Sequence, residues 1–362
     1  MKKRWLYWVV CWIVFGYGTV PTARVQAEGD LVYAGLIGPV GAPAGAKTVQ
    51  MLRIDQPGVY ENLIVDGEWG DFDLVKITAD NVVLRNCTIR NGLRDAVEVY
   101  GKNVKIENCK IHHVLKGVFG DGADAHGITG RPLNLTIRNT EVAYVSGDAI
   151  QFDPSRKLEP YPWDNVLVEN CFLWTGPLDA DYGGYKKGER PGENAFDSKT
   201  HPEQPRARIT FRKCLMKGWG HGEIGNGAAM NFKEKVAGVV DNCVFVENDI
   251  AFRCRGTRGS AWVTIRNATV YQTSRVFRLE HEVQNMKNFH MAYGEGVVEK
   301  VTLASGGAGQ GYVNVGEREA PSLLIWPYTK LLVGSIVPAG DPPESSDANI
   351  PTKTATGWDG SN

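Results

Sequence analysis

Two cations, Lys233 and Arg255, stand 22 residues apart in two similar short segments of this chain. The segments read MNFKEK from Met230 and FRCRG from Phe252, and in both of them apolar residues alternate with polar ones. A lysine can act as a general base, and a nearby arginine can stabilise negative charge that develops during a reaction. The pair therefore predicts chemistry on an acidic substrate, if the fold brings the two segments side by side.

Related segments occur earlier and later in the chain, and they carry polar residues at matching positions. They start at Asp95, His126, Asp148, Asn194 and Arg275. We aligned them on the apolar residues that must face inward if the segments are strands. The first outward column is then Glu98, Thr129, Gln151, Asp197, Asn231, Arg253 and Arg278, and the second is Tyr100, Arg131, Asp153, Lys199, Lys233, Arg255 and Glu280. Cations gather in the later rungs, so the columns predict either an anion-binding face or an ion-pair network on a solvated sheet.

A second recurring pattern predicts the fold. It reads NVVLRNCTI from Asn81, NVKIENCKI from Asn103, NLTIRNTEV from Asn134, NVLVENCFL from Asn165, RITFRKCLM from Arg208, GVVDNCVFV from Gly238 and WVTIRNATV from Trp262. The copies are 22 to 43 residues apart, which is typical of a solenoid whose loops differ in length. Apolar residues recur at every second position, so the repeats are strands and not helices. The sequence therefore predicts an all-β, single-domain parallel β-helix.

The centre of each repeat predicts stacked ladders of equal side chains. Equivalent residues of a parallel stack lie about 4.8 Å apart, and asparagine tolerates the left-handed turn that such a coil needs. The expected asparagine ladder is Asn86, Asn108, Asn139, Asn170, Asn242 and Asn267, interrupted at Lys213. The cysteines that follow it are Cys87, Cys109, Cys171, Cys214 and Cys243. We expect them to point inward as free thiols, with disulfide bridges between coils as the alternative.

The ends of the chain predict export and capping. A basic start, an apolar run from Trp5 to Tyr17 and a small-x-small triplet ending at Ala27 indicate a signal peptide over residues 1–27, with an uncleaved anchor as the alternative. We therefore expect a secreted protein, extracellular or periplasmic. Residues 28–62 are expected to cap the solenoid, 63–284 to form it, 285–337 to close its other end, and 338–362 to be a disordered tail.

The overall charge excludes some classes of partner. The chain has 40 Lys and Arg against 41 Asp and Glu, so no global field favours nucleic acid or an anionic membrane. No second apolar run follows the signal segment, and we expect no membrane partner after its cleavage. The protein is expected to be a monomer whose partner is an acidic polysaccharide.

The order of short strand, Asn turn, short strand, long loop and charged strand resembles the pectate-lyase-like superfamily of right-handed β-helix proteins, over most of the mature chain. More narrowly, MNFKEK followed by FRCRG is similar to lyases of the alginate lyase and chondroitinase B type. The resemblance implies that Lys233 is the catalytic base and that Arg255 acts near the departing oxygen. The arginine of that group is usually followed by His-Gly, whereas Arg255 is followed by Gly256 and Thr257, so the substrate stays open.

The reaction implied is β-elimination in a uronate-containing polysaccharide. It removes the proton at C5, which is too weakly acidic unless a cation or Ca²⁺ neutralises the adjacent carboxylate. Cations on the neighbouring rungs favour the neutral amine that Lys233 needs as a base. The expected substrate-binding residues are Lys199, Arg253, Arg278, His126 and Asn231. Asp153 and Asp197 are expected to hold Ca²⁺, with pairing to nearby cations as the alternative.

Two further functions remain open. A glycoside hydrolase needs two carboxylates that flank the bond, and Gly220-His221-Gly222 resembles the GHG motif of polygalacturonases. A non-catalytic polysaccharide-binding or surface β-helix needs only the charged face. Two long loops precede charged strands, Thr175–Glu193 and Gly117–Ala125. In either case we expect these loops to form the walls of a cleft at those strands.

Overall fold

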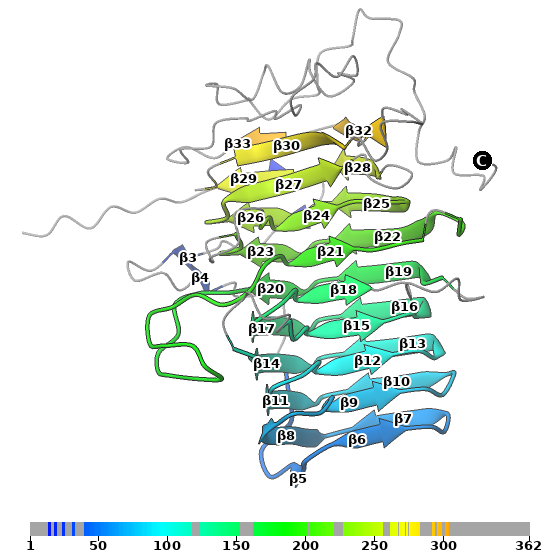
Figure 1. Ribbon diagram of the computed structural model, residues 1–362, viewed down its shortest axis with the longest axis vertical. Coiled ribbons are helices and arrows are strands. Elements are labelled where there is room, and N and C mark those ends of the chain that lie inside the picture. The colour runs from blue at the N-terminus through cyan, green and yellow to red at the C-terminus, as the bar shows by residue number, and fades with distance from the viewer. Residues whose placement is uncertain are drawn as a thin grey trace, which may run out of the picture.

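The strands of the protein stack into an elongated solenoid (Figure 1). The computed structural model describes residues 40–117, 124–152, 162–201, 203–220, 227–255, 261–266, 268–271 and 273, and beyond these only the backbone of short strands near residues 14–32 and 275–303. None of the described residues is helical, so this part of the chain contains no helix that could cross a membrane.

Three parallel sheets run along the solenoid. Sheet 1 contains β7 (Gly58–Glu61), β10 (Val82–Arg85), β13 (Lys102–Glu107), β16 (Leu133–Arg138), β19 (Asp164–Glu169), β22 (Ala207–Arg212), β25 (Val236–Asp241), β28 (Trp262–Arg266) and β32 (Glu295–Val298). Sheet 2 contains β5 (Lys47–Val49), β8 (Leu63–Gly70), β11 (Thr88–Gly92), β14 (Lys110–Val114), β17 (Glu141–Val145), β20 (Phe172–Trp174), β23 (Leu215–Lys217), β26 (Val244–Val246), β29 (Ala268–Tyr271) and β33 (Val301–Leu303).

Sheet 3 completes each coil. It contains β6 (Leu52–Ile54), β9 (Val75–Ile77), β12 (Val97–Val99), β15 (Ile128–Gly130), β18 (Ile150–Phe152), β21 (Phe196–Ser198), β24 (Met230–Phe232), β27 (Ile250–Arg255), β30 (Arg275–Glu282) and the antiparallel β31 (Ala292–Tyr293). Each coil passes through the sheets in turn, and connections of this kind between parallel strands are right-handed. The chain is a right-handed parallel β-helix, as predicted.

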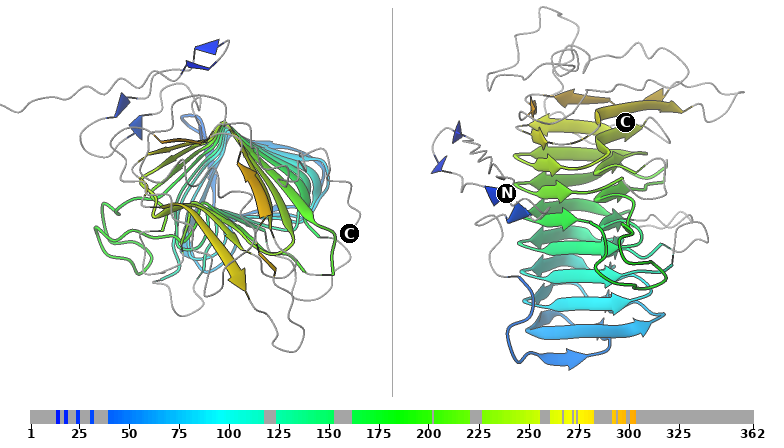
Figure 2. Two further views of the ribbon diagram at one scale, coloured as in Figure 1. Left: turned by 90° about the horizontal axis from the view of Figure 1, so that it is seen from above. Right: turned by 90° about the vertical axis from the view of Figure 1, so that its left-hand side faces the viewer.

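The core lies inside the three sheets, which enclose it when the solenoid is viewed from its end (Figure 2). Apolar residues stack in register along the axis because every second side chain of a strand points inward. In sheet 3 the inward stack includes Val97, Ile128, Ile150, Phe196, Met230 and Phe252. This packing holds the outward residues of successive coils in register.

The asparagine ladder is confirmed from Asn86 to Asn139. Asn86 donates to Asn62 (3.3 Å), Asn108 to Asn86 (3.3 Å) and Asn139 to Asn108 (3.2 Å), so the ladder begins one coil earlier than predicted. All rungs have a left-handed backbone, and Lys213 has it too (φ 53°), which is why lysine can replace asparagine there. Farther along, Asn242 bonds Asp241 instead, and Asn267 lies outside the described residues.

A second asparagine ladder stands at the entrance to sheet 1. Its rungs are Asn81, Asn103, Asn134 and Asn165, which donate to one another in order at 3.0, 3.0 and 2.7 Å. These residues open the repeats in the sequence, but we had not predicted that they stack. The five cysteines of the predicted inner ladder are buried and free as expected, and so is Cys254 of β27 in sheet 3. Where a coil lacks cysteine, Thr140 takes its place and its hydroxyl accepts the N–H of Cys109.

The described solenoid starts at Lys47, inside the segment 28–62 for which we expected a cap. Strands β5, β6 and β7 pair in parallel with the next coil and belong to the stack. At the other end, β32 and β33 continue sheets 1 and 2 beyond residue 284. The expected tail, 338–362, lies outside the described residues, and the signal peptide remains a prediction.

Candidate functional site

One outward line of sheet 3, here called the polar row, runs along eight successive paired strands. The strand register aligns Lys76, Glu98, Thr129, Gln151, Asp197, Asn231, Arg253 and Arg278. From Glu98 onward this is the first column predicted from the sequence. Six of its members, from Glu98 to Arg253, are buried although they lie on the outer face. Buried polar groups are costly unless they are paired, so their partners show what the row is built for.

Lys233 forms an ion pair with Asp197 at the centre of the row. The ammonium Nζ lies 2.8 Å from Oδ2 of Asp197, and little of either side chain is exposed. Ser198 fixes the backbone of the lysine, because its hydroxyl accepts the N–H of Lys233 and donates to its carbonyl, both at 2.8 Å. The expectation for Lys233 had named only neighbouring cations, whereas pairing with a cation was the alternative expected for Asp197.

Arg255 follows Cys254, which pairs with Phe232, and Lys233 follows Phe232. Continuing this register places Lys233 and Arg255 on neighbouring rungs, as the sequence predicted. For Arg255 and Arg278 only the strand position is described, opposite Glu280 and Arg253 respectively. The buried Arg253 lies in the row beside Asn231. Its side chain or backbone interacts with other residues, so it is not without a partner.

The structure describes only some of the other expected site residues. Lys199 lies directly after β21 and is half-buried, and its carbonyl accepts the indole N–H of Trp163 at 2.8 Å. Asp153 lies outside the described residues, and so do the histidine and second glycine of the GHG motif. The first glycine of that motif, Gly220, ends a described segment. The calcium role expected for Asp153 and the motif's likeness to polygalacturonases therefore stay predictions.

His126 belongs to a third ladder, which we had not predicted. The ring Nδ1 of His126 accepts the backbone N–H of Asp148 (2.9 Å), and the backbone N–H of His126 donates to Oδ1 of Asp95 (2.8 Å). On the next coil, Asn194 donates to Oδ1 of Asp148 (2.6 Å) and accepts the N–H of Ala228 (2.7 Å). The sequence does contain a sign of this ladder, namely a polar residue that opens four successive segments of sheet 3: Asp95, His126, Asp148 and Asn194.

The tautomer of His126 follows from these bonds. Burial, the largest cause, lowers its pKa to about 4, so the ring is neutral near pH 7. Because Nδ1 accepts a hydrogen bond, the ring proton is on Nε2, which contacts the amide of Gln151. Two N–H groups do not bond each other, so the amide oxygen of Gln151 is the atom that accepts this proton. His126 thus orients Gln151 in the polar row.

Glu193 is a site residue that we had missed. It is half-buried at the end of the long loop, and its N–H donates to the carbonyl of Gly147 (2.9 Å). Burial is the largest cause that raises its pKa to about 7; Asp124 and Asp197 act in the same direction and the two lysines of the site in the opposite one. Asp148, fully buried behind the row, has a pKa raised well above its ordinary value by burial and by Asp197. The site therefore holds carboxyl groups that keep protons near neutral pH.

The long loop Thr175–Glu193 lies mainly against sheet 2 rather than along sheet 3. Leu178 and Tyr185 pack on Leu115, and Tyr182 stacks on Trp69 with ring centroids 5.8 Å apart. In Figure 1 the loop projects beside β14, β17 and β20. The expectation that it walls a cleft at the charged strands is therefore wrong for most of its length. Only its end brings Glu193 to sheet 3.

Besides the amide of Gln151, whose orientation His126 decides, two buried oxygens of the row lack a hydrogen-bond partner in the described structure, Oδ1 of Asp197 and Oδ1 of Asn231. They lie on adjacent rungs and can accept hydrogen bonds from a ligand. They do not fit calcium well, because Ca²⁺ takes six to eight oxygens and Lys233 already occupies the other oxygen of Asp197. Among the described residues, no group of three possible ligand side chains that includes Asp197 has its atoms within 4.8 Å of one another.

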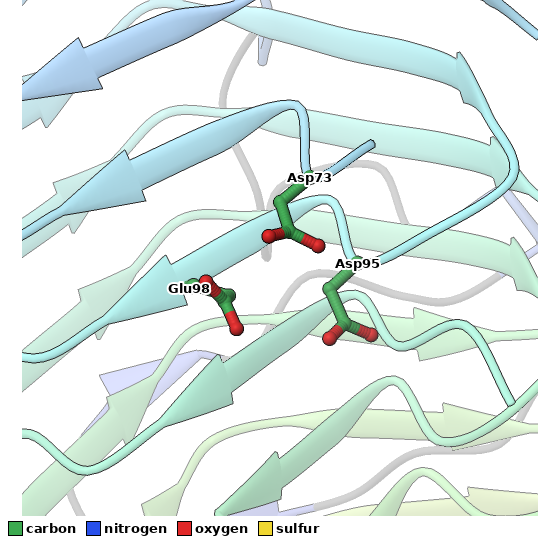
Figure 3. A group of neighbouring side chains, drawn as sticks. All are labelled: Asp73, Asp95 and Glu98. Carbon is green, nitrogen blue, oxygen red and sulfur yellow. The ribbon is translucent and has the colours of Figure 1, made fainter. Parts of the chain in front are cut away.

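Another position offers three carboxylates. Among the described residues, Asp73, Asp95 and Glu98 are the one group of three possible ligands with an oxygen of each within 4.8 Å of the others, and Figure 3 shows the three carboxylates near one another. Burial is the main cause that raises the pKa of Asp73, and it raises that of Asp95 to about 6. This group was not predicted, because Asp73 and Asp95 lie outside both aligned columns.

The comparisons with known proteins give one family match and several similar solved structures. A family model for the right-handed β-helix region matches residues 74–171, and no curated protein matches the chain by sequence. Similar solved structures include the pectate lyase Pel9A, with 13% identity over 78% of this chain and 68% of that chain (TM-score 0.45). An alginate lyase from Paenibacillus sp. str. FPU-7 is 14% identical over 75% and 88% (TM-score 0.49). An endo-xylogalacturonan hydrolase from Aspergillus tubingensis is 13% identical over 76% and 81% (TM-score 0.42).

At these identities the similarity concerns the fold alone, and the activity has to be argued from the residues of this chain. The chain is similar in fold to right-handed parallel β-helix proteins, among them lyases and a hydrolase.

Proposed function

We propose that the protein is a secreted, monomeric polysaccharide lyase that cleaves an acidic, uronate-containing polysaccharide by β-elimination. The observation that carries this proposal is the buried ion pair of Lys233 with Asp197, on the rung beside Arg255. A lysine held by a carboxylate and flanked by further cations supplies both a proton acceptor and the positive charge that a uronate requires.

The step follows from these groups. The base must be the neutral amine of Lys233, and the 2.8 Å contact with Asp197 gives the ammonium proton a route to that carboxylate before the step begins. The neutral amine removes the C5 proton of the uronate, the electron pair of that bond forms the C4–C5 double bond, and the C4–O bond breaks. Arg255 or a water molecule supplies the proton to the departing oxygen. The products are an unsaturated uronate end and a new free hydroxyl.

The remaining residues of the row are assigned to substrate binding. Lys199 and Arg253, with Arg278 one rung farther, would neutralise uronate carboxylates, whose developing charge is the main electrostatic barrier. The unpaired oxygens of Asp197 and Asn231 would accept hydrogen bonds from sugar hydroxyls. His126 acts on the substrate only through Gln151, so it is a positioning residue. No calcium ion is assigned to this step.

Glu193 favours a second candidate function, glycoside hydrolysis. A carboxyl group whose pKa is about 7 can protonate a leaving oxygen near neutral pH, and Asp197 could activate a water molecule as the base. In this mechanism Lys233 would remain an ammonium that holds the substrate. The two functions differ in their products, since a hydrolase forms reducing ends without a double bond.

A product assay on pectate, alginate and glycosaminoglycans decides between them. A lyase raises the ultraviolet absorbance with each cleavage, a hydrolase raises only the reducing ends, and a binding protein raises neither. For the active polymer we expect Lys233→Met to lower kcat at least about a thousandfold, because the base is lost. Lys105→Met, an exposed lysine on sheet 1, is the matched control and should keep full activity.

Loss of Lys233 leaves a buried carboxylate without its partner, which can unfold the variant. The double variant Lys233→Met/Asp197→Asn removes both charges and should regain stability while remaining inactive. Wild-type rates of double-bond formation in either folded variant would refute the assignment of the base.

A further inference from the structure

Three successive rungs of the polar row each contain a buried polar atom that has no hydrogen-bond partner among the described residues. The atoms belong to Gln151, Asp197 and Asn231, which lie in register on β18, β21 and β24. These residues are 2%, 3% and 4% exposed. A buried polar atom without a partner destabilises the fold, so three of them in line favour groups that are kept for a ligand.

The free atom of Gln151 is a donor, unlike the other two. The ring Nδ1 of His126 accepts the backbone N–H of Asp148 (2.9 Å), so its Nε2 carries the proton and donates to the amide oxygen of Gln151. The amide nitrogen therefore occupies the end of the side chain that has no partner. His126 thus determines that Gln151 offers N–H groups to a ligand, not an oxygen.

The row consequently presents one donor followed by two acceptors. Successive rungs are about 4.8 Å apart, so the free atoms of Gln151, Asp197 and Asn231 span about 10 Å. A complementary ligand has an acceptor at the first rung and hydroxyl donors at the next two. A carboxylate can only accept hydrogen bonds, whereas hydroxyls can donate them. A sugar that carries both a carboxylate and hydroxyls matches this order.

Positive charge lies beside the donor. The backbone N–H of Lys199 donates to the carbonyl of Phe152, the residue after Gln151, at 3.3 Å. The ammonium of Lys199 also influences His126, because it is one of the causes that lower the pKa of this ring, although burial is the largest. A carboxylate that accepts from Gln151 therefore has a cation nearby to balance its charge.

The position of the base agrees with a carboxylate at this rung. Nζ of Lys233 lies 2.8 Å from Asp197, one rung from Gln151. In a uronate the C5 carbon is bonded to the carboxylate carbon, so an amine that removes the C5 proton has to lie close to the carboxylate. Lys233 and Lys199 are partly exposed, and a ligand can reach the row past these flexible side chains.

We propose that Gln151 determines substrate specificity, and that its amide N–H groups donate to the carboxylate of the uronate bound beside Lys233. The identity of the sugar rests on the proposed function. The assignment also fixes how the sugar lies, with its carboxylate at the rung of Gln151 and its hydroxyls at the rungs of Asp197 and Asn231. Hydrogen bonds to a charged group are stronger than those to a neutral one, so Gln151 separates acidic from neutral polymers.

Affinity electrophoresis in gels that contain pectate or alginate, each in its native and its carboxyl-reduced form, tests this role. Gln151→Glu keeps an oxygen for the Nε2–H of His126 and lacks the outward donor. We expect it to raise Kd for the native polymer about ten- to a hundredfold, and Kd for the reduced polymer less than about twofold. Gln151→Met removes the donor without adding charge and should weaken native binding about tenfold. KM of a cleaved polymer should rise in parallel.

Gln204→Met is the matched control, because it makes the same substitution at a buried glutamine in the connection from β21 to β22. It should keep the wild-type preference for the native polymer. Circular dichroism shows whether each variant is folded, and the Glu variant provides the test if the Met variant is not. Equal weakening on both forms of the polymer, an equal loss in the control, or no binding of native polymer by the wild type would overturn the proposal.

The product assay on the wild type separates this inference from the proposed function. Double-bond formation by the wild type, together with an unchanged preference in both Gln151 variants, would refute the role of Gln151 alone. A preference that is lost in the variants of a wild type that forms no double bonds would refute the lyase alone.

Discussion

At the scale of single residues, the polar row shows how a solenoid can bury charge on its outer face. Asp197 and Lys233 share one 2.8 Å contact, and Ser198 holds the lysine backbone from the neighbouring coil. Breaking a buried pair of this kind costs roughly 3–5 kcal/mol, whereas replacing both members by apolar groups is often neutral. Because such a pair adds little net stability, a chemical role explains its presence better than a contribution to folding does.

Glu193 predicts a pH dependence of stability. Its pKa is about 7 in the folded chain and 4.5 in the ordinary state, so the folded form retains a proton that the unfolded form releases. Burial of this group therefore does not lower the stability below about pH 4.5, and it lowers the stability by its full amount above about pH 7. Between these values the stability falls as the pH rises. Glu193→Gln lacks the cost, so its advantage in Tm over the wild type should grow across this interval. We expect on the order of 1 kcal/mol, or about 3 °C, because the side chain is partly exposed.

The measurement is a series of thermal melts from pH 4 to 8. Glu203→Gln removes an exposed glutamate and should follow the wild-type curve at every pH. Parallel curves for Glu193→Gln and the wild type would contradict the raised pKa.

Ser198 predicts a kinetic effect of a residue that does not touch the substrate. Ser198→Ala removes both hydrogen bonds to the backbone of Lys233, so the amine should be less well placed. We expect kcat to fall about tenfold with KM nearly unchanged, and a stability loss of about 1–2 kcal/mol. Thr140→Ala is the control, since its hydroxyl accepts the N–H of Cys109 and donates to the carbonyl of Arg138, both away from the row. It should lose similar stability and keep its kcat, and equal kinetic loss in both variants would count against positioning.

At the scale of elements, the turns position the site through their ladders. Two asparagine ladders hold the entrance and exit of sheet 1, and the ladder through His126 holds the entrance of sheet 3. The asparagines of the exit ladder were predictable, because the motif is local and repeats in the sequence. The His126 ladder was not, because its rungs differ in residue type and are joined by side-chain to backbone bonds across coils.

Asn108 is the rung that tests the ladder. It donates to Asn86, accepts from Asn139 and has φ 54°, so Asn108→Ala loses two amide bonds and also strains the backbone. We expect a loss of about 2–4 kcal/mol in urea unfolding. Asn108→Gly loses the same bonds without the strain, and should recover about 1 kcal/mol of that loss. Equal midpoints for the alanine and glycine variants would show that the left-handed turn contributes nothing.

At the scale of the whole molecule, the charge is balanced and the cations of the site are local. With a formal net charge of −1, the protein exerts no long-range attraction on a polyanion. Under the proposed function, recognition of an acidic polymer would therefore come from short contacts to Lys199, Arg253 and their neighbours, which salt screens only in part.

This arrangement predicts a moderate salt effect. Between about 0.05 and 0.5 M salt, KM for an acidic polymer should rise a few-fold up to about tenfold, while kcat changes little. Steady-state kinetics at several salt concentrations provide the measurement, with Lys105→Met as the control for a distant exposed lysine. A KM that is independent of salt would argue against charge recognition in the row.

The sequence by itself determined the architecture and the first outward column, because strand alternation and a repeating turn motif are local patterns that stacking converts directly into a solenoid. It also brought Lys233 and Arg255 to neighbouring rungs. Only the tertiary structure decided that Asp197 pairs with Lys233, that Glu193 reaches sheet 3 while its loop packs on sheet 2, and that Asp73 converges with Asp95 and Glu98. These contacts depend on side-chain direction and burial between coils, which no spacing along the chain encodes.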